Sequence, residues 1–241
     1  MQRIVVCFDL DDTLYKEIDY LASAYGEIAT SVGHPEMVPQ MVKWYQDGEN
    51  VFQKLNEYLG ADIPIADYLK KYRAHYPTIS LTAWVEDTLN ELKNRGVVLG
   101  IITDGRSVSQ RNKIKALGLE RWFDNENIII SEEFGSEKTD ERNFRFFQDK
   151  YPDSSFVYVG DNPEKDFVVP NRMGWQTVMI KDDGRNIHKQ GAAPTEYLPQ
   201  LTITEIDELL HKITYGWKAM PRQLPNDQTK TCQMTKRKRA K

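Results

Sequence analysis

Cysteine is scarce in this sequence, which has only two among its 241 residues, Cys7 and Cys232. Because the two lie far apart, they indicate neither a disulfide framework nor a cysteine-rich metal motif. A signal-peptide pattern is missing before the first apolar run, and no apolar run approaches the ~20 residues that a membrane helix needs. These absences argue against a disulfide-stapled secreted domain and a membrane protein, and we expect a cytoplasmic location.

An excess of positive charge is missing as well. Lysine and arginine number 32 against 36 aspartates and glutamates, so the net charge is −4. Bulk electrostatics therefore do not draw the molecule to nucleic acid or to an anionic membrane, and we expect neither partner. The basic run at residues 236–241 closes a polar stretch without apolar periodicity, and we expect residues 217–241 to form a disordered tail.

Short apolar runs alternate with helical patterns along most of the chain. Continuous apolar runs of this length indicate strands that are buried on both faces, as in a parallel sheet. Strands that alternate with helices are typical of an α/β fold with a doubly wound, Rossmann-like sheet. The predicted strands are residues 3–8, 97–103, 127–131, 155–160 and 176–181, with a weaker sixth near 197–201.

Residues 15–82 interrupt this alternation, because they contain no convincing strand. Apolar residues recur there at helical spacing, for example Leu21, Tyr25 and Ile28. The aromatic residues of this stretch at helical spacing, Trp44, Tyr45 and Phe52, are more typical of a core than of a substrate cleft. The chain thus predicts a catalytic core formed by residues 1–14 and 83–216, with an all-helical subdomain inserted at 15–82.

The first predicted strand is followed directly by Asp9, Asp11 and Asp12. Ligands of parallel sheets bind at the carboxyl ends of the strands. In an extended stretch Asp9 and Asp11 point the same way, because the side-chain period is two. One carboxylate can then attack phosphorus as a nucleophile while the other transfers protons to the leaving group and from water. Taken alone, the motif is also compatible with a loop of solvated acids or an Asx turn.

Polar residues follow the second predicted strand and also occur in the loop after the third. Thr103, Asp104 and Gly105 end the second strand, and a threonine hydroxyl with loop amides can hold phosphate oxygens. Lys138, in the loop after the third strand, can offset phosphate charge. Each of these signals is weak alone, since Thr-Asp-Gly is an ordinary turn and most lysines are solvated.

The fourth predicted strand leads into two further carboxylates, Asp161 and Asp166, after a glycine at residue 160. Together with Asp9 they offer oxygen ligands of the kind that Mg²⁺ prefers. Four polar loops thus follow successive strands of one predicted sheet, in the order needed to meet at its carboxyl edge. We therefore expect them to form one site.

In this order and spacing the four loops resemble the four motifs of the haloacid dehalogenase (HAD) superfamily, in its phosphatase branch with a helical cap between the first and second motifs. The matching motifs are Asp9-Leu10-Asp11-Asp12-Thr13, Thr103, Lys138 and residues 160–166. The resemblance implies that residues 15–82 are the cap of a Rossmann-like core.

The resemblance also implies roles for single residues. Asp9 is implied as nucleophile and Mg²⁺ ligand, and Asp11 as general acid and base whose backbone carbonyl also binds the metal. Thr103 and Lys138 are implied to hold the phosphoryl group. Asp161 is implied to complete the metal site, with Asp166 as a further metal ligand or as a residue that supports the ligands.

Other residues receive weaker expectations. Lys138 is followed by Thr139, where such proteins commonly have proline, and we expect Thr139 to cap the next helix. Arg106 is compatible with a leaving-group contact or with a solvated position. His34 and His75 have no evident partner in the sequence, and we assign them no role.

We therefore expect a magnesium-dependent phosphohydrolase that cleaves a small phosphorylated metabolite, of the sugar- or nucleotide-phosphate class, through an aspartyl-phosphate. Residues 104–110 resemble sugar- and nucleotide-phosphatase relatives, but they name no substrate. Two alternatives stay open: a phosphomutase or phosphotransferase of the same superfamily, and a catalytically idle relative that binds or regulates. A dehalogenase is disfavoured, because it attacks carbon and needs neither the metal nor a second acid at Asp11. The sequence indicates no oligomeric state.

Overall fold

A parallel sheet organises the part of the chain that the structure describes. The computed structural model describes residues 2–214, so the predicted tail at residues 217–241 lies outside the described part. Six strands run in the order β3-β2-β1-β4-β5-β6, and all neighbouring pairs are parallel. The strands are β1 (Ile4–Phe8), β2 (Val98–Thr103), β3 (Ile128–Ile130), β4 (Ser155–Gly160), β5 (Gln176–Ile180) and β6 (Leu201–Ile203).

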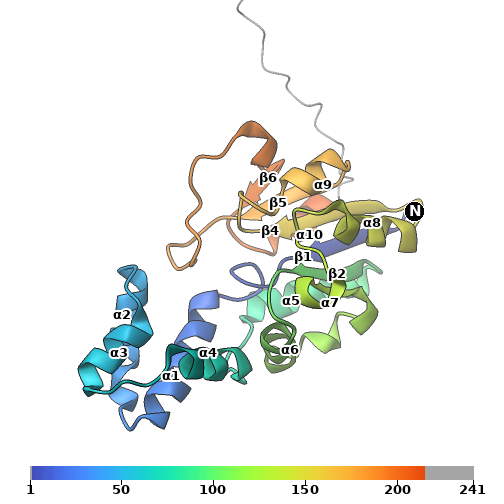
Figure 1. Cartoon of the computed structure of the whole chain (residues 1–241). Helices are drawn as coiled ribbons and strands as arrows, with labels where there is room; N and C mark the ends of the chain where they lie inside the picture. The colour runs from blue at the N-terminus through green and yellow to red at the C-terminus, as the bar shows by residue number, and fades with distance from the viewer. Residues whose placement is uncertain (1, 215–241) are drawn as a thin grey trace, which may run out of the picture.

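The strands are apolar because helices cover both faces of the sheet (Figure 1). Alternate residues of β1 face opposite layers: Val6 and Phe8 belong to one buried cluster, and Val5 and Cys7 to the other. The first cluster includes side chains of α5 (Ala83–Asn94), α6 (Ser107–Ala116) and α10 (Glu208–Thr214), and the second those of α8 (Glu141–Lys150) and α9 (Val168–Arg172). The predicted α/β fold with a doubly wound parallel sheet is therefore confirmed.

The strand register brings the predicted motifs to one edge. Phe8 of β1 lies level with Ile101 of β2 and with Val159 of β4. The backbone N–H of Asp9 donates to the carbonyl of Val159 at 2.8 Å, so β1 and β4 stay paired to the first motif residue. The loops after β1, β2 and β4 thus leave the sheet side by side.

A helical insertion, defined here as residues 15–82, separates β1 from β2 and lies below and to the left of the sheet in Figure 1. It contains α1 (Glu17–Ser31), the short η1 (Pro35–Met37), α2 (Val38–Gln46), α3 (Val51–Leu59) and α4 (Ile65–Ala74). These elements bury a core of their own, in which Phe52 stacks on Tyr68 at 5.1 Å between ring centroids. The insertion therefore has an interior of its own, which meets the cluster on the sheet where Tyr20 of α1 belongs to that cluster and Tyr72 of α4 packs against both. None of the described helices has the length and apolarity to cross a membrane.

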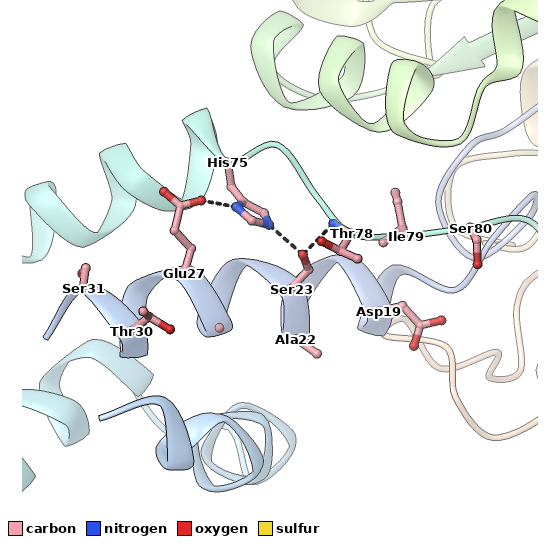
Figure 2. A pocket seen from close by; sticks show the side chains of 11 residues that line it. Asp19, Ala22, Ser23, Glu27, Thr30, Ser31, His75, Thr78, Ile79 and Ser80 are labelled. Carbon is pink, nitrogen blue, oxygen red and sulfur yellow. Dashed lines mark hydrogen bonds and ion pairs between the residues drawn. The ribbon is translucent and has the colours of Figure 1, made fainter. Parts of the chain in front are cut away.

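Hydrogen bonds fasten the second connection of the insertion, near residues 75–82, to α1. His75 is buried, and its ring nitrogens contact Ser23 Oγ at 2.7 Å and a carboxylate oxygen of Glu27. Ser23 Oγ also accepts from the backbone N–H of Thr78 (Figure 2). These groups line a groove of about 830 Å³. The expectation that His75 lacks partners was wrong, because the sequence separates residues that the fold places together.

The start of one helix also differs from expectation. The N-cap of α8 is Asp140, whose Oδ1 accepts from the backbone N–H of Arg142 at 2.9 Å, and not Thr139. After β4, residues 163–167 form turns and bends before α9 begins at Val168. The remaining short elements are α7 (Ser131–Phe134), η2 (Leu119–Arg121), η3 (Asn125–Asn127) and η4 (Thr195–Tyr197).

The sheet packs tightly on α8 at Gly100 of β2. A Cβ added there would lie 2.6 Å from two ring carbons of Phe147 and 2.9 Å from Cys7 Sγ. We predict that Gly100→Ala lowers the free energy of unfolding by about 1–3 kcal/mol, the usual cost of overpacking. Chemical denaturation measures this, with Gly191→Ala as control, since a Cβ there meets nothing within 4 Å. Equal stability of both variants would contradict the packing argument.

Candidate active site

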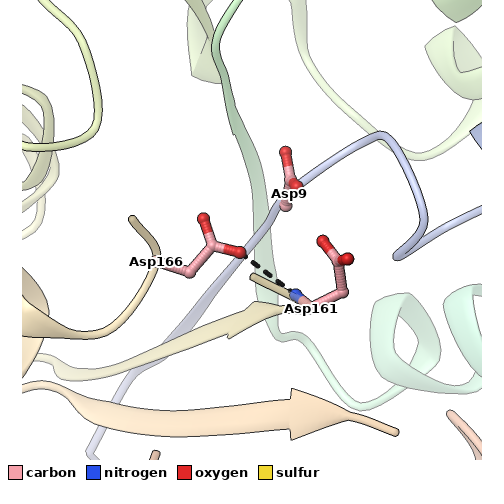
Figure 3. Close-up of side chains that lie close together, drawn as sticks. All are labelled: Asp9, Asp161 and Asp166. Carbon is pink, nitrogen blue, oxygen red and sulfur yellow. Dashed lines mark hydrogen bonds between the residues drawn. The ribbon is translucent and has the colours of Figure 1, made fainter. Parts of the chain in front are cut away.

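Three buried carboxylates meet at the carboxyl edge of the sheet (Figure 3). Asp9 follows β1, Asp161 follows β4, and Asp166 precedes α9. Each offers an oxygen within 4.8 Å of the others, and all three residues are at most 5% exposed. Oxygen ligands from a few carboxylates are the donor set that Mg²⁺ prefers, so these residues fit the metal that the resemblance implied.

Backbone amides hold Asp166 in this cluster. Its Oδ2 accepts from the N–H groups of Asp161 at 3.1 Å and Asn162 at 2.9 Å. The carboxylate lies directly over Gly160, where a Cβ would be 2.4 Å from Oδ2. Gly160 is therefore required by this close approach, and the glycine at the end of β4 helps to place the acid.

Lys138 supplies the buried positive charge among these acids. Its Nζ lies 2.6 Å from Asp9 Oδ1 and 2.9 Å from Asp166 Oδ1. Burial alone would lower the pKa of Lys138, but the carboxylates of Asp166 and Asp9 raise it well above its ordinary value. The ammonium therefore stays charged. Asp104 positions its loop, since Asp104 Oδ1 accepts from the backbone N–H of Lys138 at 3.0 Å.

One lysine does not balance three acids. Burial and the neighbouring carboxylates raise the pKa of Asp9 to about 7, although Lys138 opposes the shift. Burial and the charges of Asp9 and Asp166 raise the pKa of Asp161 to about 9. A cation bound among these carboxylates would relieve both effects.

Asp11 is held by three donors that surround its carboxylate. Oδ1 accepts from Lys113 Nζ at 2.7 Å and from the Tyr15 hydroxyl at 2.5 Å, and Oδ2 accepts from Gln110 Nε2 at 2.8 Å. Burial tends to raise the pKa of Asp11, but the charge of Lys113 and these hydrogen bonds bring it below its ordinary value. Gln110 Nε2 also donates to Thr103 Oγ1 at 2.7 Å, so α6 joins the first and second motifs.

Only part of the second motif, Thr103-Asp104-Gly105, lines the cleft that the acids share. Thr103 is buried at the end of β2 and lines the cleft together with Asp104. The N–H of Gly105 donates to Ser131 Oγ at 2.9 Å, so this amide is engaged within the protein. The exposed Arg106 pairs with Glu132 at 2.6 Å.

A cleft of about 130 Å³ opens over these groups. Its lining combines the predicted site residues with others that the sequence analysis did not single out. The lining residues are Asp9, Asp11, Asp12, Glu17, Thr103, Asp104, Lys138, Asp161, Asn162, Lys165, Asp166 and His188.

The loop after β5 holds Asp161 in place, a role of this loop that the sequence analysis missed. Asn186 is buried, and its Nδ2 donates to Asp161 Oδ2 at 3.0 Å while its Oδ1 accepts from Lys16 Nζ at 2.7 Å. Gln190 Nε2 donates to the backbone carbonyl of Asp161 at 2.7 Å. Amides scattered in a polar loop follow no sequence pattern that indicates such contacts. For Lys113 and Gln110 the sequence does carry a signal. The two residues lie three positions apart, so they share one face of a helix with the apolar Ile114.

The comparisons with known proteins agree with this arrangement. The sequence pattern of the haloacid dehalogenase-like hydrolase family matches residues 6–180. The chain therefore belongs to the haloacid dehalogenase-like hydrolase family. Among solved structures, the magnesium-bound HAD-hydrolase YfnB from Bacillus subtilis superposes with a TM-score of 0.67 at 21% identity, over 89% of this chain and 100% of that chain. This similarity supports the fold.

Similar curated proteins are phosphatases. A glyceraldehyde 3-phosphate phosphatase of Methanocaldococcus jannaschii is 29% identical over 196 residues, which are 73% of this chain and 83% of that protein. A glyceraldehyde 3-phosphate phosphatase of Pyrococcus furiosus is 28% identical over 236 residues, 87% of this chain and 93% of that protein. A phosphoserine phosphatase of Methanocaldococcus jannaschii is 33% identical over 132 residues, 53% of this chain and 58% of that protein.

Asp12 has a structural role beside the acids. It adopts a positive φ of 54°, which aspartate tolerates better than most residues. Its Oδ1 accepts from the backbone N–H of Glu17 at 2.9 Å, and its Oδ2 from that of Ile187 at 2.8 Å. The side chain thus joins the start of α1 to the loop after β5.

We predict that Asp12→Ala lowers the free energy of unfolding by about 1–3 kcal/mol, because two partly buried amides lose their acceptor. Chemical denaturation with a two-state fit measures the change. Asp124→Ala serves as control, since the side chain of Asp124 makes no capping hydrogen bond to the helix that follows it. A loss no larger than that of the control would show that water replaces the Asp12 carboxylate at both amides.

Proposed function

We propose that the protein is a magnesium-dependent phosphohydrolase that cleaves a small phosphate monoester through an aspartyl-phosphate on Asp9. The observation that supports this most strongly is the convergence of Asp9, Lys138, Asp161 and Asp166 at one sheet edge. A buried nucleophile beside a fixed cation suits attack on an anion. The family and the phosphatase names of several relatives point to the same reaction.

In this mechanism a carboxylate oxygen of Asp9 attacks phosphorus, and the bond from phosphorus to the ester oxygen breaks. Lys138 and the hydroxyl of Thr103 hold the phosphoryl oxygens. Mg²⁺ held by Asp9, Asp161 and Asp166, with the backbone carbonyl of Asp11, would offset the repulsion between the nucleophile and the phosphate. Water then cleaves the aspartyl-phosphate and regenerates Asp9.

Asp11 is the proposed proton donor to the leaving oxygen and the base that later activates water. Its carboxylate reaches the cleft from the same loop as Asp9, two residues further along. In the present arrangement both Asp11 oxygens accept hydrogen bonds, which stabilises the ionised carboxylate. This is the form needed for the base step, whereas the acid step requires a proton on one of the Asp11 oxygens.

The helical insertion is the proposed cap. It stands between the first and second motifs, and Glu17, its first helical residue, lines the cleft. Closure of the insertion would exclude water from the reacting phosphate. We assign the substrate to the sugar- or nucleotide-phosphate class and place the enzyme in the cytoplasm. Relatives that act on glyceraldehyde 3-phosphate and phosphoserine are compatible with a small phosphorylated metabolite.

We predict that release of inorganic phosphate from a panel of sugar and nucleotide phosphates requires Mg²⁺. Chelation with EDTA should abolish turnover, and added Mg²⁺ should restore it, because the acids of the cluster repel an unshielded phosphate. Asp9→Asn should form no phosphoenzyme with any donor, whereas Asp62→Asn, an exposed site in the insertion, should behave as the parent protein. Full turnover after exhaustive chelation would contradict the metal requirement.

We predict that Asp11→Asn slows the cleavage of phosphate esters with poor leaving groups more than that of esters with good leaving groups. Alkyl phosphates need a proton as the ester bond breaks, and a positioned acid typically contributes ~10²–10⁴-fold. Cleavage of alkyl phosphates should therefore fall by about that factor, while phosphoenzyme formation from an activated aryl phosphate falls less. Rapid-quench labelling should find phosphoenzyme accumulating on Asp9, since its hydrolysis also needs Asp11. Equal slowing of both ester classes without accumulation would remove Asp11 from this role.

A further inference from the structure

Lys113 is a buried lysine that none of the four motifs includes. It lies on α6, is only 3% exposed, and its ammonium sits 2.7 Å from Asp11 Oδ1. Lysines are almost never fully buried unless paired, because removal of the charge from water is costly. Its burial beside the proposed acid therefore needs an explanation.

The other contacts of Lys113 come from the helical insertion. Its Nζ lies 3.6 Å from the Glu17 carboxylate and 4.4 Å from the centre of the Tyr20 ring, and both residues are in the first turn or so of α1. An ammonium over an aromatic ring is attracted by the ring's electron-rich face. One ammonium thus contacts the proposed acid in the core and the base of the insertion.

The rest of α6 reinforces this connection. Gln110, three residues before Lys113, donates to the second oxygen of Asp11 and to Thr103. On the same helix, Ser109 Oγ donates to the carbonyl of Arg73 at 2.9 Å. Asn112 Nδ2 donates to the carbonyl of His75 at 3.0 Å. Thus α6 contacts the end of α4 and the second connection of the insertion as well as the site.

We propose that Lys113 is a positioning residue that fixes the carboxylate of Asp11 and makes its orientation depend on where the insertion stands. The proposal rests on the function proposed for Asp11. Lys113 holds Oδ1 from one side while Gln110 holds Oδ2, so the carboxylate has one orientation. Because Glu17 and Tyr20 contact the same ammonium, movement of α1 changes the position of the group that holds Asp11.

The first test compares Lys113→Met with Lys113→Arg and with Lys115→Met, an exposed lysine on the same helix. Misplacement of a reacting group by about 1 Å can cost ~10²-fold in rate. We expect Lys113→Met to lower kcat for an alkyl phosphate by about that factor with little change in KM, and to lower phosphoenzyme formation from an aryl phosphate less. Lys113→Arg, which keeps the charge, should recover part of kcat, and Lys115→Met should match the parent protein.

A second test needs no turnover. Denaturation midpoints are measured for Lys113→Met, Asp11→Asn, Glu17→Gln and the two double variants that contain Lys113→Met. We expect the shifts to be non-additive for Lys113 with Asp11 and for Lys113 with Glu17, as for residues in contact. If Lys113→Met alone unfolds, the cycles are run with Lys113→Arg instead.

The outcomes separate the two proposals. If the parent protein cleaves no phosphate ester while both cycles show coupling, the proposed function fails and the contacts of Lys113 stand. If the parent protein is an active phosphatase and the kcat of Lys113→Met equals that of the parent protein for both ester classes, the positioning role is wrong. Additive midpoints for Lys113 with Glu17 would likewise overturn the connection to the insertion.

Discussion

The constraint on which the site depends is the burial of like charges at one sheet edge. Asp9, Asp161 and Asp166 converge there with at most 5% exposure each. Isolated buried carboxylates are costly, so each must find donors or cations. Lys138 meets part of this need, and the backbone amides after β4 meet another part at Asp166. The negative charge that remains suits the pocket to a divalent cation, which would in turn offset the repulsion between these acids and a phosphate.

The regular parts of this arrangement could be predicted from the sequence. Strands covered on both faces need continuous apolar runs, and such runs placed β1, β2, β4 and β5 within a residue or so of their observed bounds. Parallel strands bring their carboxyl ends to one edge, so acids that follow different strands were expected to meet. For this reason the grouping of Asp9, Asp161 and Asp166 followed from topology alone, although their roles in catalysis stay predictions.

The contacts that surround these acids could not be predicted in the same way. Asn186 reaches Asp161 from a loop 25 residues further along the chain, and His75 finds Glu27 across 48 residues. Such pairs depend on tertiary packing, which leaves no periodic trace in the sequence. The prediction of the N-cap residue of α8 was wrong for a local reason. Thr139 and Asp140 are both good N-cap residues, and which of them faces the free amides depends on the turn before the helix. Gln110 and Lys113 were not predicted either, although polar residues that share a helix face with apolar ones are a signal that the sequence does carry.

The position of α6 explains why the motifs and the helical insertion can act together. Its side chains bond Asp11 and Thr103 on the core side, and they bond the end of α4 and contact α1 on the other side. A helix that contacts both cannot let the insertion shift without altering at least one set of contacts, because packed interiors are stiff. The proposed acid is therefore oriented by contacts that reach the insertion as well as the sheet. If the insertion closes over a substrate as proposed, closure and the placement of Asp11 would be one event, in which binding energy from the substrate's remote part would serve the chemical step.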